Sequence, residues 1–161
     1  MPRTKRMLIE GVCYHIINRG NQKQRVFLKE GDYKKYLEIV KHYKKKFYFK
    51  IYAYCLMPNH VHLIIESRDT KDLAKIMQGV TQVYSVWFNN KYNKIGRLWQ
   101  GRYKSKIIEK DKYLIDCLKY IELNPIRAKI VASPSEYLWN SWQERKLSDN
   151  GFYLLDVPEI L

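Results

Sequence analysis

The alternation of apolar and polar positions divides this chain into short strands and longer helices. Residues two apart share one face of a strand, whereas buried helical residues recur every three or four positions. The spacing of Tyr36, Leu37, Val40 and Tyr43, for example, predicts a helix. Strands are predicted at 12–19, 47–56, 60–66 and 105–109, and helices at 32–46, 70–90 and 111–123.

Capping and turn residues mark where these elements end. Thr70 and Asp111 precede helical patterns and are predicted to be N-caps. Pro58 separates two strands that form a hairpin or a bulged pair, and Pro125 closes the last helix. Residues 93–104 lack apolar periodicity and contain two glycines, so we expect a loop there.

The element order is strand, helix, strand, strand, helix, strand, helix. Its first six elements match the ferredoxin-like (split βαβ) layout of an α+β fold, an antiparallel sheet with helices on one face, and the seventh is an extra C-terminal helix. A length of 161 residues without a linker predicts one domain over 1–161. A basic N-terminal arm (about 1–11) and a weakly patterned tail (about 133–161) flank it.

Charge narrows the class of partner. Thirty Lys and Arg face sixteen Asp and Glu, which gives a net charge of +14. Such an excess favours nucleic acid first and an acidic membrane second, although a generically basic protein is also compatible with it. Fourteen Tyr and four Trp favour single-stranded nucleic acid, because bases stack on aromatic rings while phosphates meet cations.

Other compositional features argue against a membrane or secreted protein. The three cysteines are scattered through apolar segments, which is typical of core residues in a reducing cytoplasm rather than of a disulfide framework. No apolar segment is long enough to span a membrane, and no signal peptide is evident. We therefore expect a cytoplasmic protein without a membrane partner, either a monomer or a homodimer.

The most specific local feature is the segment His60-Val61-His62. In a strand, the two imidazoles project from one face, and two convergent imidazoles form half of a metal site. The alternative is a chance pair of surface histidines. His15 and His42 are more readily explained as structural residues.

Tyr120 lies on the last predicted helix, at the flank of its apolar stripe, so its ring should be half exposed. Asn124 is one turn later on the same side. By themselves these are an ordinary boundary tyrosine and a helix-ending asparagine. Beside a metal that polarises a phosphate, however, a phenol can attack a phosphodiester. Two imidazoles and an amide oxygen leave coordination positions open, unlike the four strong ligands of a structural zinc.

Together these motifs resemble those of the single-tyrosine HUH transposases, especially the REP-associated tyrosine transposase branch. The resemblance extends from about residue 14 to 142. The matching segments are 14–15, 18–21 (NRGN), 57–63 (MPNHVHL), 96–105 (GRLWQGRYKS), 120–121, 124–125 and 127–128.

The resemblance implies an enzyme that cleaves and rejoins single-stranded DNA near hairpins. His60 and His62 would bind Mg²⁺ or Mn²⁺, with Asn124 as a third, amide-type ligand. Tyr120 would be the nucleophile that forms a 5′-phosphotyrosine link and frees a 3′-OH. Lys129 stands where the family usually has glycine, a difference expected to affect a turn rather than the chemistry.

DNA contacts are expected mainly from the basic segment between the two catalytic motifs. The candidates are Arg19, Arg97, Trp99, Gln100, Arg102 and Lys104. The alternative is a solvated loop with Trp99 tucked into the core.

Three functions stay open at this point. They are a strand-transfer enzyme, a nicking or replication-initiator-like endonuclease with the same chemistry, and a non-catalytic nucleic-acid-binding module. The complete set of His60, His62, Tyr120 and Asn124 argues against the third.

Overall fold

A four-stranded antiparallel sheet forms the centre of the molecule. The computed structural model describes residues 13–147 and 151–158. The strands are β1 (Cys13–Arg19), β2 (Lys50–Met57), β3 (His60–Glu66) and β4 (Lys104–Ile108), in the order β2-β3-β1-β4. Sequence-adjacent β2 and β3 form a hairpin, whereas β1 lies between β3 and β4. This arrangement confirms the predicted ferredoxin-like sheet.

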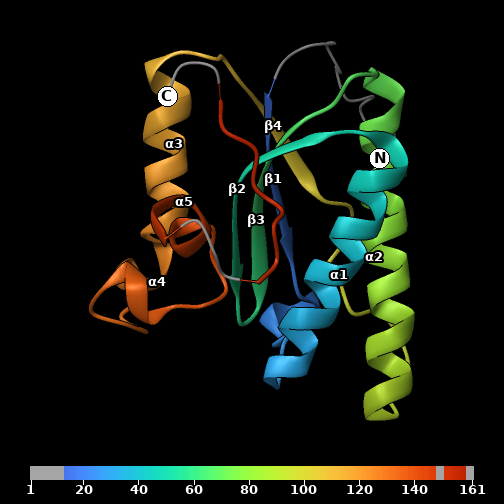
Figure 1. The fold of residues 1–161 in the computed structure, drawn as a ribbon. Helices are drawn as coiled ribbons and strands as arrows, with labels where there is room; N and C mark the ends of the chain where they lie inside the picture. Colours follow the sequence, from blue (N-terminus) through green and yellow to red (C-terminus); the bar gives the residue numbers. More distant parts are fainter. Residues whose placement is uncertain (1–12, 148–150, 159–161) are drawn as a thin grey trace.

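Helices cover both faces of the sheet. Helices α1 (Glu30–Phe47) and α2 (Thr70–Tyr92) pack side by side on one face, and α3 (Lys112–Glu122) lies on the other (Figure 1). The shorter helices are η1 (Asn21–Lys23), α4 (Asn124–Arg127), η2 (Pro134–Glu136) and α5 (Trp142–Leu147). The extra helix after the ferredoxin-like unit is therefore confirmed.

Strand alternation sends different side chains to the two faces. On β3, Val61, Leu63 and Ile65 are buried in the core under α1 and α2. His60 and His62 point to the opposite face, on which α3 lies. The sheet thus separates an apolar interior from a face that carries the histidines.

A buried carboxylate ties the start of α1 to the end of α2. Asp32 has a fully buried side chain that accepts hydrogen bonds from Lys91 Nζ and Tyr92 Oη, both at 2.6 Å. It also accepts from the backbone N–H of Leu28 and Lys29. Burial by itself raises the pKa of Asp32, but these four donors outweigh it and hold the pKa below its usual range.

The C-terminal tail covers the outer edge of β2. The backbone N–H of Leu56 donates to Trp139 O at 2.8 Å, and that of Ser141 donates to Tyr54 O at 2.9 Å. Farther along the edge, the N–H of Asp156 donates to Ile51 O at 2.7 Å. The segment that had no clear pattern in sequence is therefore an integral part of the fold.

Several predicted boundaries shift by a few residues. The N-cap of α2 is Asp69 rather than Thr70, and its carboxylate accepts from the N–H of Lys71. Strand β2 begins at Lys50 rather than at 47, because Tyr48 adopts a left-handed conformation that ends α1. The predicted basic arm (1–11) and position 12 lie outside the described residues.

The described helices are also informative about membranes. Within residues 13–147 and 151–158, none has the length and apolar character needed to cross a bilayer.

Cys13 and Cys55 are buried and Cys117 is partly buried, and all three are free thiols, as expected for core residues.

Candidate active site

The two histidines of β3 lie close together near the turn of the β2–β3 hairpin. Their ring centroids are 4.9 Å apart, and His62 is only 6% exposed. The turn itself is held from outside, because the N–H of Gly20 donates to Asn59 O and the N–H of Val26 donates to Pro58 O, both at 2.8 Å. A rigid turn of this kind positions the imidazoles before any ligand arrives.

Hydrogen bonds engage one nitrogen of each ring. His60 Nδ1 lies 2.6 Å from Asn59 Oδ1, which can only accept, so this nitrogen carries the proton. His62 Nδ1 lies 3.0 Å from His15 Nε2 on the neighbouring strand. Both contacts leave Nε2 available, which is how polar neighbours commonly orient metal-binding histidines.

Burial keeps these rings neutral. It lowers the pKa of His60 to about 4, with a smaller effect of the Arg19 charge. It lowers the pKa of His62 to about 3, assisted by the neighbouring His60 and His15 rings and by the Arg127 and Arg19 charges. Neutral imidazoles are the form that binds a metal cation.

Tyr120 lines a cavity whose wall also includes His15. Its side chain is 52% exposed, which confirms the half-exposed position predicted from helical spacing. The cavity has a volume of about 380 Å³ and lies between α3 and the sheet. Its lining residues are His15, Lys106, Ile108, Tyr113, Asp116, Cys117 and Tyr120. His60 and His62 are not among these lining residues, but His15 contacts His62 and so links the wall of the cavity to the histidine pair.

Arg127 packs directly on the Tyr120 ring. Its guanidinium carbon lies 3.8 Å from the ring centroid, and Nη2 donates to the Tyr120 carbonyl oxygen. The same charge contributes to the lowered pKa of His62. Arg127 thus contacts the Tyr120 ring and is also near enough to His62 to affect its pKa.

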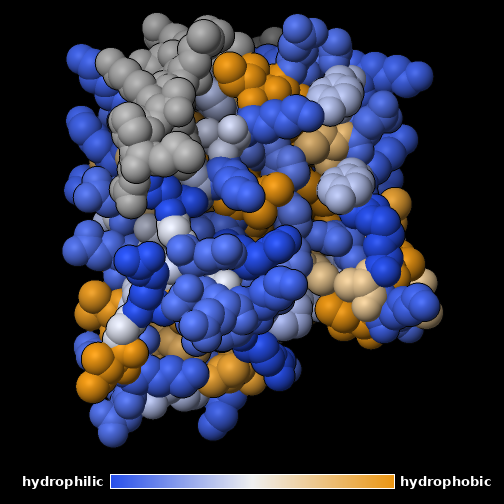
Figure 2. Space-filling view, turned by 180° about the vertical axis from the view of Figure 1, so that it is seen from behind, coloured by the Kyte–Doolittle hydropathy of each residue, from blue (hydrophilic) through white to orange (hydrophobic). Residues whose placement is uncertain are grey.

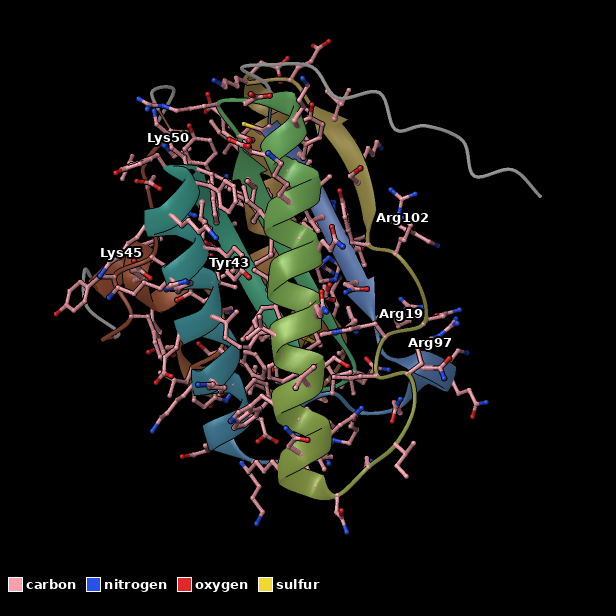
Figure 3. The ribbon with its side chains drawn as sticks, turned by 90° about the vertical axis from the view of Figure 1, so that its right-hand side faces the viewer. Arg19, Tyr43, Lys45, Lys50, Arg97 and Arg102 are labelled. Atoms are coloured by element: carbon pink, nitrogen blue, oxygen red, sulfur yellow. The ribbon has the colours of Figure 1, made fainter. Side chains whose placement is uncertain are left out.

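Several predicted DNA-contact residues gather at one edge of the molecule. Arg19 lies at the end of β1, and Arg97 and Arg102 lie in the loop between α2 and β4. All three project on the same side, away from Lys45 and Lys50 (Figure 3). Gln100 and Lys104 are also exposed in this region. Seen from behind, the surface is predominantly hydrophilic, with apolar residues in separate patches (Figure 2).

Trp99 does not provide the ring face that the sequence suggested. It is 6% exposed and packs near Tyr36 and Tyr84, with centroids 6.3 Å and 6.1 Å away. Its Nε1 donates to Thr81 O at 3.2 Å. The prediction that bases stack on Trp99 is therefore wrong. A β-bridge to Gly20 draws the residue against the sheet, where its large apolar ring is buried.

Comparison with known proteins assigns the family. The family model for IS200-like transposases matches residues 9–124, most of the chain. The chain belongs to this transposase family. A Haemophilus influenzae protein named as a REP-associated tyrosine transposase is 27% identical over 118 residues, or 66% of this chain. The match spans 64% of that relative, so the chain covers less than two thirds of its length.

Solved structures of transposases share the fold. A REP-associated tyrosine transposase bound to a REP hairpin has a TM-score of 0.74 and 19% identity, covering 98% of this chain and 90% of that one. A transposase from Deinococcus radiodurans has a TM-score of 0.50 and 18% identity, covering 75% and 96%. At these identities the likeness establishes the architecture of the family member described here.

The side chains of this family member suit an open cation site. Among the described residues, no group of three or more His, Cys, Asp and Glu side chains could enclose a metal. Two neutral imidazoles with free Nε2 atoms instead leave most coordination positions to water and substrate, as in catalytic rather than structural sites. The two imidazoles therefore fit a divalent cation with an incomplete set of protein ligands.

Asn124 does not lie on the same helix as Tyr120, although its spacing had suggested so. Helix α3 ends at Glu122, Leu123 is a break, and Asn124 begins α4. Helical spacing from Tyr120 therefore no longer determines its direction. Asn124 is half-buried, and its role as a ligand stays a prediction.

Sequence reasoning gave no site role to His15 or Arg127. Both belong to segments that match the family motifs, but the residue types alone have many ordinary explanations. Their contacts depend on the pairing of β1 with β3 and on the turn from α3 into α4. The only indication of a site role in the sequence was that each residue lies in a segment that matches the family, 14–15 for His15 and 127–128 for Arg127.

Proposed function

We propose that this transposase cleaves single-stranded DNA beside a hairpin and rejoins it through a covalent link to Tyr120. The observation that supports it most directly is the shared cavity. Tyr120 and His15 line it together, and His15 is hydrogen-bonded to His62. An exposed phenol is thus linked through His15 to a pair of neutral imidazoles, in a chain whose net charge is +14.

In the proposed reaction, Tyr120 Oη attacks a backbone phosphorus. A new P–O bond forms, the bond to the 3′ oxygen breaks, and the phenol proton passes to water while the leaving oxygen takes up a proton. The products are a 5′-phosphotyrosine and a free 3′-OH. Attack of a 3′-OH on the link reverses the step, and because the ester is conserved the strands rejoin without an external energy source.

His60, His62 and Asn124 are the residues that would hold the cation, Mg²⁺ or Mn²⁺. When bound, it supplies positive charge that polarises the scissile phosphate. The protein contributes orientation: Asn59 and His15 fix the two imidazoles, and Arg127 restrains the Tyr120 ring by stacking.

A solved structure with the same fold suggests which form of DNA is the substrate. The solved relative with the same fold is bound to a REP hairpin. In this chain the exposed Arg19, Arg97 and Arg102 lie on one side, where they can follow a flexible backbone. A single strand can bend towards a tyrosine on a helix flank, whereas a duplex is stiff. Unpaired DNA next to a hairpin is therefore the proposed substrate.

Two hydroxyls on α3 allow a matched test of the nucleophile. Tyr113 and Tyr120 are both 52% exposed and line the same cavity. With a hairpin oligonucleotide carrying a single-stranded flank, and Mg²⁺ or Mn²⁺, Tyr120→Phe should lose the covalent adduct by at least about 100-fold, or about 2.7 kcal/mol. Tyr113→Phe should retain it. Denaturing gel electrophoresis of labelled DNA measures the adduct.

The same assay separates the competing functions. An adduct of normal yield in Tyr120→Phe, lost in Tyr113→Phe, would assign the nucleophile to Tyr113. Supplying a second oligonucleotide with a free 3′-OH tests rejoining, because a strand-transfer enzyme yields a longer labelled product. Adduct without any rejoined product would favour a nicking endonuclease.

A further inference from the structure

A gap in the β1–β4 ladder forms a second small cavity beside the candidate active site. The ladder runs regularly to the pair Ile17 and Lys104. Pairing resumes only where the N–H of Gln100 donates to Arg19 O at 2.9 Å. Residues 101–103 therefore stand opposite Asn18 alone and bow away from β1. The gap leaves a cavity of about 340 Å³.

The residues around this gap are cationic or polar, with none acidic among the described ones that line it. They are Ile17, Asn18, Arg19, Gln100, Gly101, Arg102 and Lys104. Arg19, Arg102 and Lys104 are exposed, and their positive charges surround the opening. A negatively charged ligand is the chemistry that this lining favours.

Asn18 provides an independent indication of a ligand. The residue is only 3% exposed, and its Nδ2 has no hydrogen-bond partner among the described residues. A buried amide donor left unpaired costs about 1–3 kcal/mol, so native structures rarely keep one without a partner. Asn18 is paired with Val61, so its side chain leaves β1 on the face covered by α1 and α2, whereas Arg19 is paired with His60 on the other face. Asn18 nevertheless lines the gap, where the ladder is open, and a ligand oxygen that enters there could accept this bond.

Gly101 leaves the gap accessible without being required by the fold. A Cβ added at this position would meet no heavy atom within 4 Å, and the residue does not have a positive φ. By contrast, a Cβ at Gly20 would lie 2.2 Å from Gln24 O, so Gly20 is needed for the turn itself. A side chain at Gly101 would intrude only on what approaches from outside.

We propose that the gap binds one backbone phosphate of the unpaired DNA strand. Asn18 Nδ2 donates to a phosphate oxygen, and Arg19, Arg102 and Lys104 neutralise its charge. Adjacent strands lie about 4.8 Å apart, so the gap, which lies between β1 and the segment leading into β4, is about 5–10 Å from the histidine strand. A phosphate held there fixes which neighbouring phosphate reaches Tyr120. This inference rests on the proposed function.

The test maps phosphates in a binding-only protein. In a Tyr120→Phe background, the probe is a hairpin oligonucleotide with a single-stranded flank. Each flank phosphate is replaced in turn by an uncharged methylphosphonate. We expect one position, or two neighbouring positions, at which neutralisation weakens binding by about tenfold.

Variants of the gap identify that position. Arg102→Ala, Gly101→Ala and Asn18→Asp should each weaken binding of the unmodified probe by at least about threefold. Each should also make binding insensitive, within about twofold, to neutralisation at that position. Lys45→Ala is the charge control, because Lys45 projects from the opposite side of the molecule (Figure 3) and should leave the positional profile unchanged. If Asn18→Asp does not fold, Gly101→Ala still tests the site, because an added Cβ there contacts no other atom of the protein.

The outcomes distinguish the two levels of the hypothesis. An unchanged positional profile in Gly101→Ala and Arg102→Ala would overturn the phosphate site, whether or not Tyr120 forms an adduct. A profile that shifts as expected, in a protein whose native form makes no adduct, would support the site and reject the proposed covalent chemistry.

Discussion

The contact between His15 and His62 determines which nitrogen of His62 faces a cation. Because Nδ1 of His62 is engaged at 3.0 Å, only Nε2 remains free. Without this contact the ring could rotate or exchange tautomers, and neither state would present the same lone pair. His15 is therefore expected to be a positioning residue for the proposed metal site.

Replacing His15 by phenylalanine should weaken Mn²⁺ binding while retaining a ring in the cavity wall. Loss of such supporting contacts typically reduces metal affinity about 10–100-fold. Titration followed by electron paramagnetic resonance, without DNA, measures it directly. His15→Gln should recover part of the affinity, and His42→Phe, on α1, should have no effect. Unaltered Mn²⁺ affinity in His15→Phe would show that His15 has a purely structural role.

The lowered histidine pKa values predict an unusual pH dependence of metal binding. A histidine whose folded pKa is depressed stays neutral as the pH falls through the ordinary histidine pKa of about 6.5. With pKa values of about 4 for His60 and about 3 for His62, protons hardly compete at pH 5.5. Mn²⁺ affinity should change less than about threefold between pH 7.5 and 5.5, whereas two ordinary imidazoles would lose about 100-fold. A loss of the larger size would contradict the pKa shifts.

The positions of side chains could be predicted from the sequence where they depend only on spacing within one strand or helix. His60 and His62 share a face because alternation within one strand requires it, and Tyr120 is half exposed because helical periodicity requires it. The contacts of His15 and Arg127 could not be predicted, since they depend on strand pairing and on a turn. Trp99 was misplaced because a tryptophan in a basic loop suits a DNA surface and a core equally well.

At the scale of elements, the turn that follows α4 contains a strained residue. Lys129 has a φ of 58°, in the left-handed region that glycine adopts without a steric penalty. The resemblance to the transposase family had indicated a local effect here, because it implies a glycine at this point. The structure confirms that the difference falls on a turn.

Lys129→Gly should therefore stabilise the protein. Relief of left-handed strain gains about 1–2 kcal/mol, offset by about 0.4–1 kcal/mol from the greater freedom of glycine in the unfolded chain. We expect a net gain of about 0.5–1 kcal/mol in urea unfolding. Lys34→Gly, at an exposed position inside α1, should instead destabilise by about 1 kcal/mol. A loss of stability in Lys129→Gly would show that its side chain has an important contact.

At the scale of the whole molecule, two long-range features were beyond sequence patterns. The order of elements was enough to predict the sheet and its helices, because alternating strands and helices allow few topologies. The cluster around Asp32 joins residues nearly sixty positions apart, and the tail pairs with a strand even more distant along the chain. Neither leaves a periodic signal, since periodicity records only local burial.

The Asp32 cluster should be a large contributor to stability. Asp32→Asn removes a buried charge and should cost roughly 2–3 kcal/mol at neutral pH. Asp72→Asn is the control, because Asp72 and Lys75 form only a loose surface ion pair at 3.9 Å and should contribute less than about 0.5 kcal/mol. Urea unfolding measures both. Equal effects of the two substitutions would contradict the role of the buried cluster.

This contribution should also depend on pH. The folded-state pKa of Asp32 is below its usual value, so the stabilisation is complete above the unfolded pKa of about 4. It is lost as the pH falls from there towards the folded pKa. The difference in stability between the native protein and Asp32→Asn should therefore shrink between pH 5 and pH 2. A difference that is constant over this range would contradict the assignment.

The tail along β2 also affects how the protein behaves at high concentration. An uncovered strand edge is a template for pairing with strands of other molecules, which leads to domain swapping and aggregation. Residues 139–141 and 156 occupy that template on β2. The other edge, β4, carries Lys104 and Lys106, whose charges repel an identical strand. Self-association through the sheet is thus discouraged at both edges, by backbone pairing at one and by charge at the other.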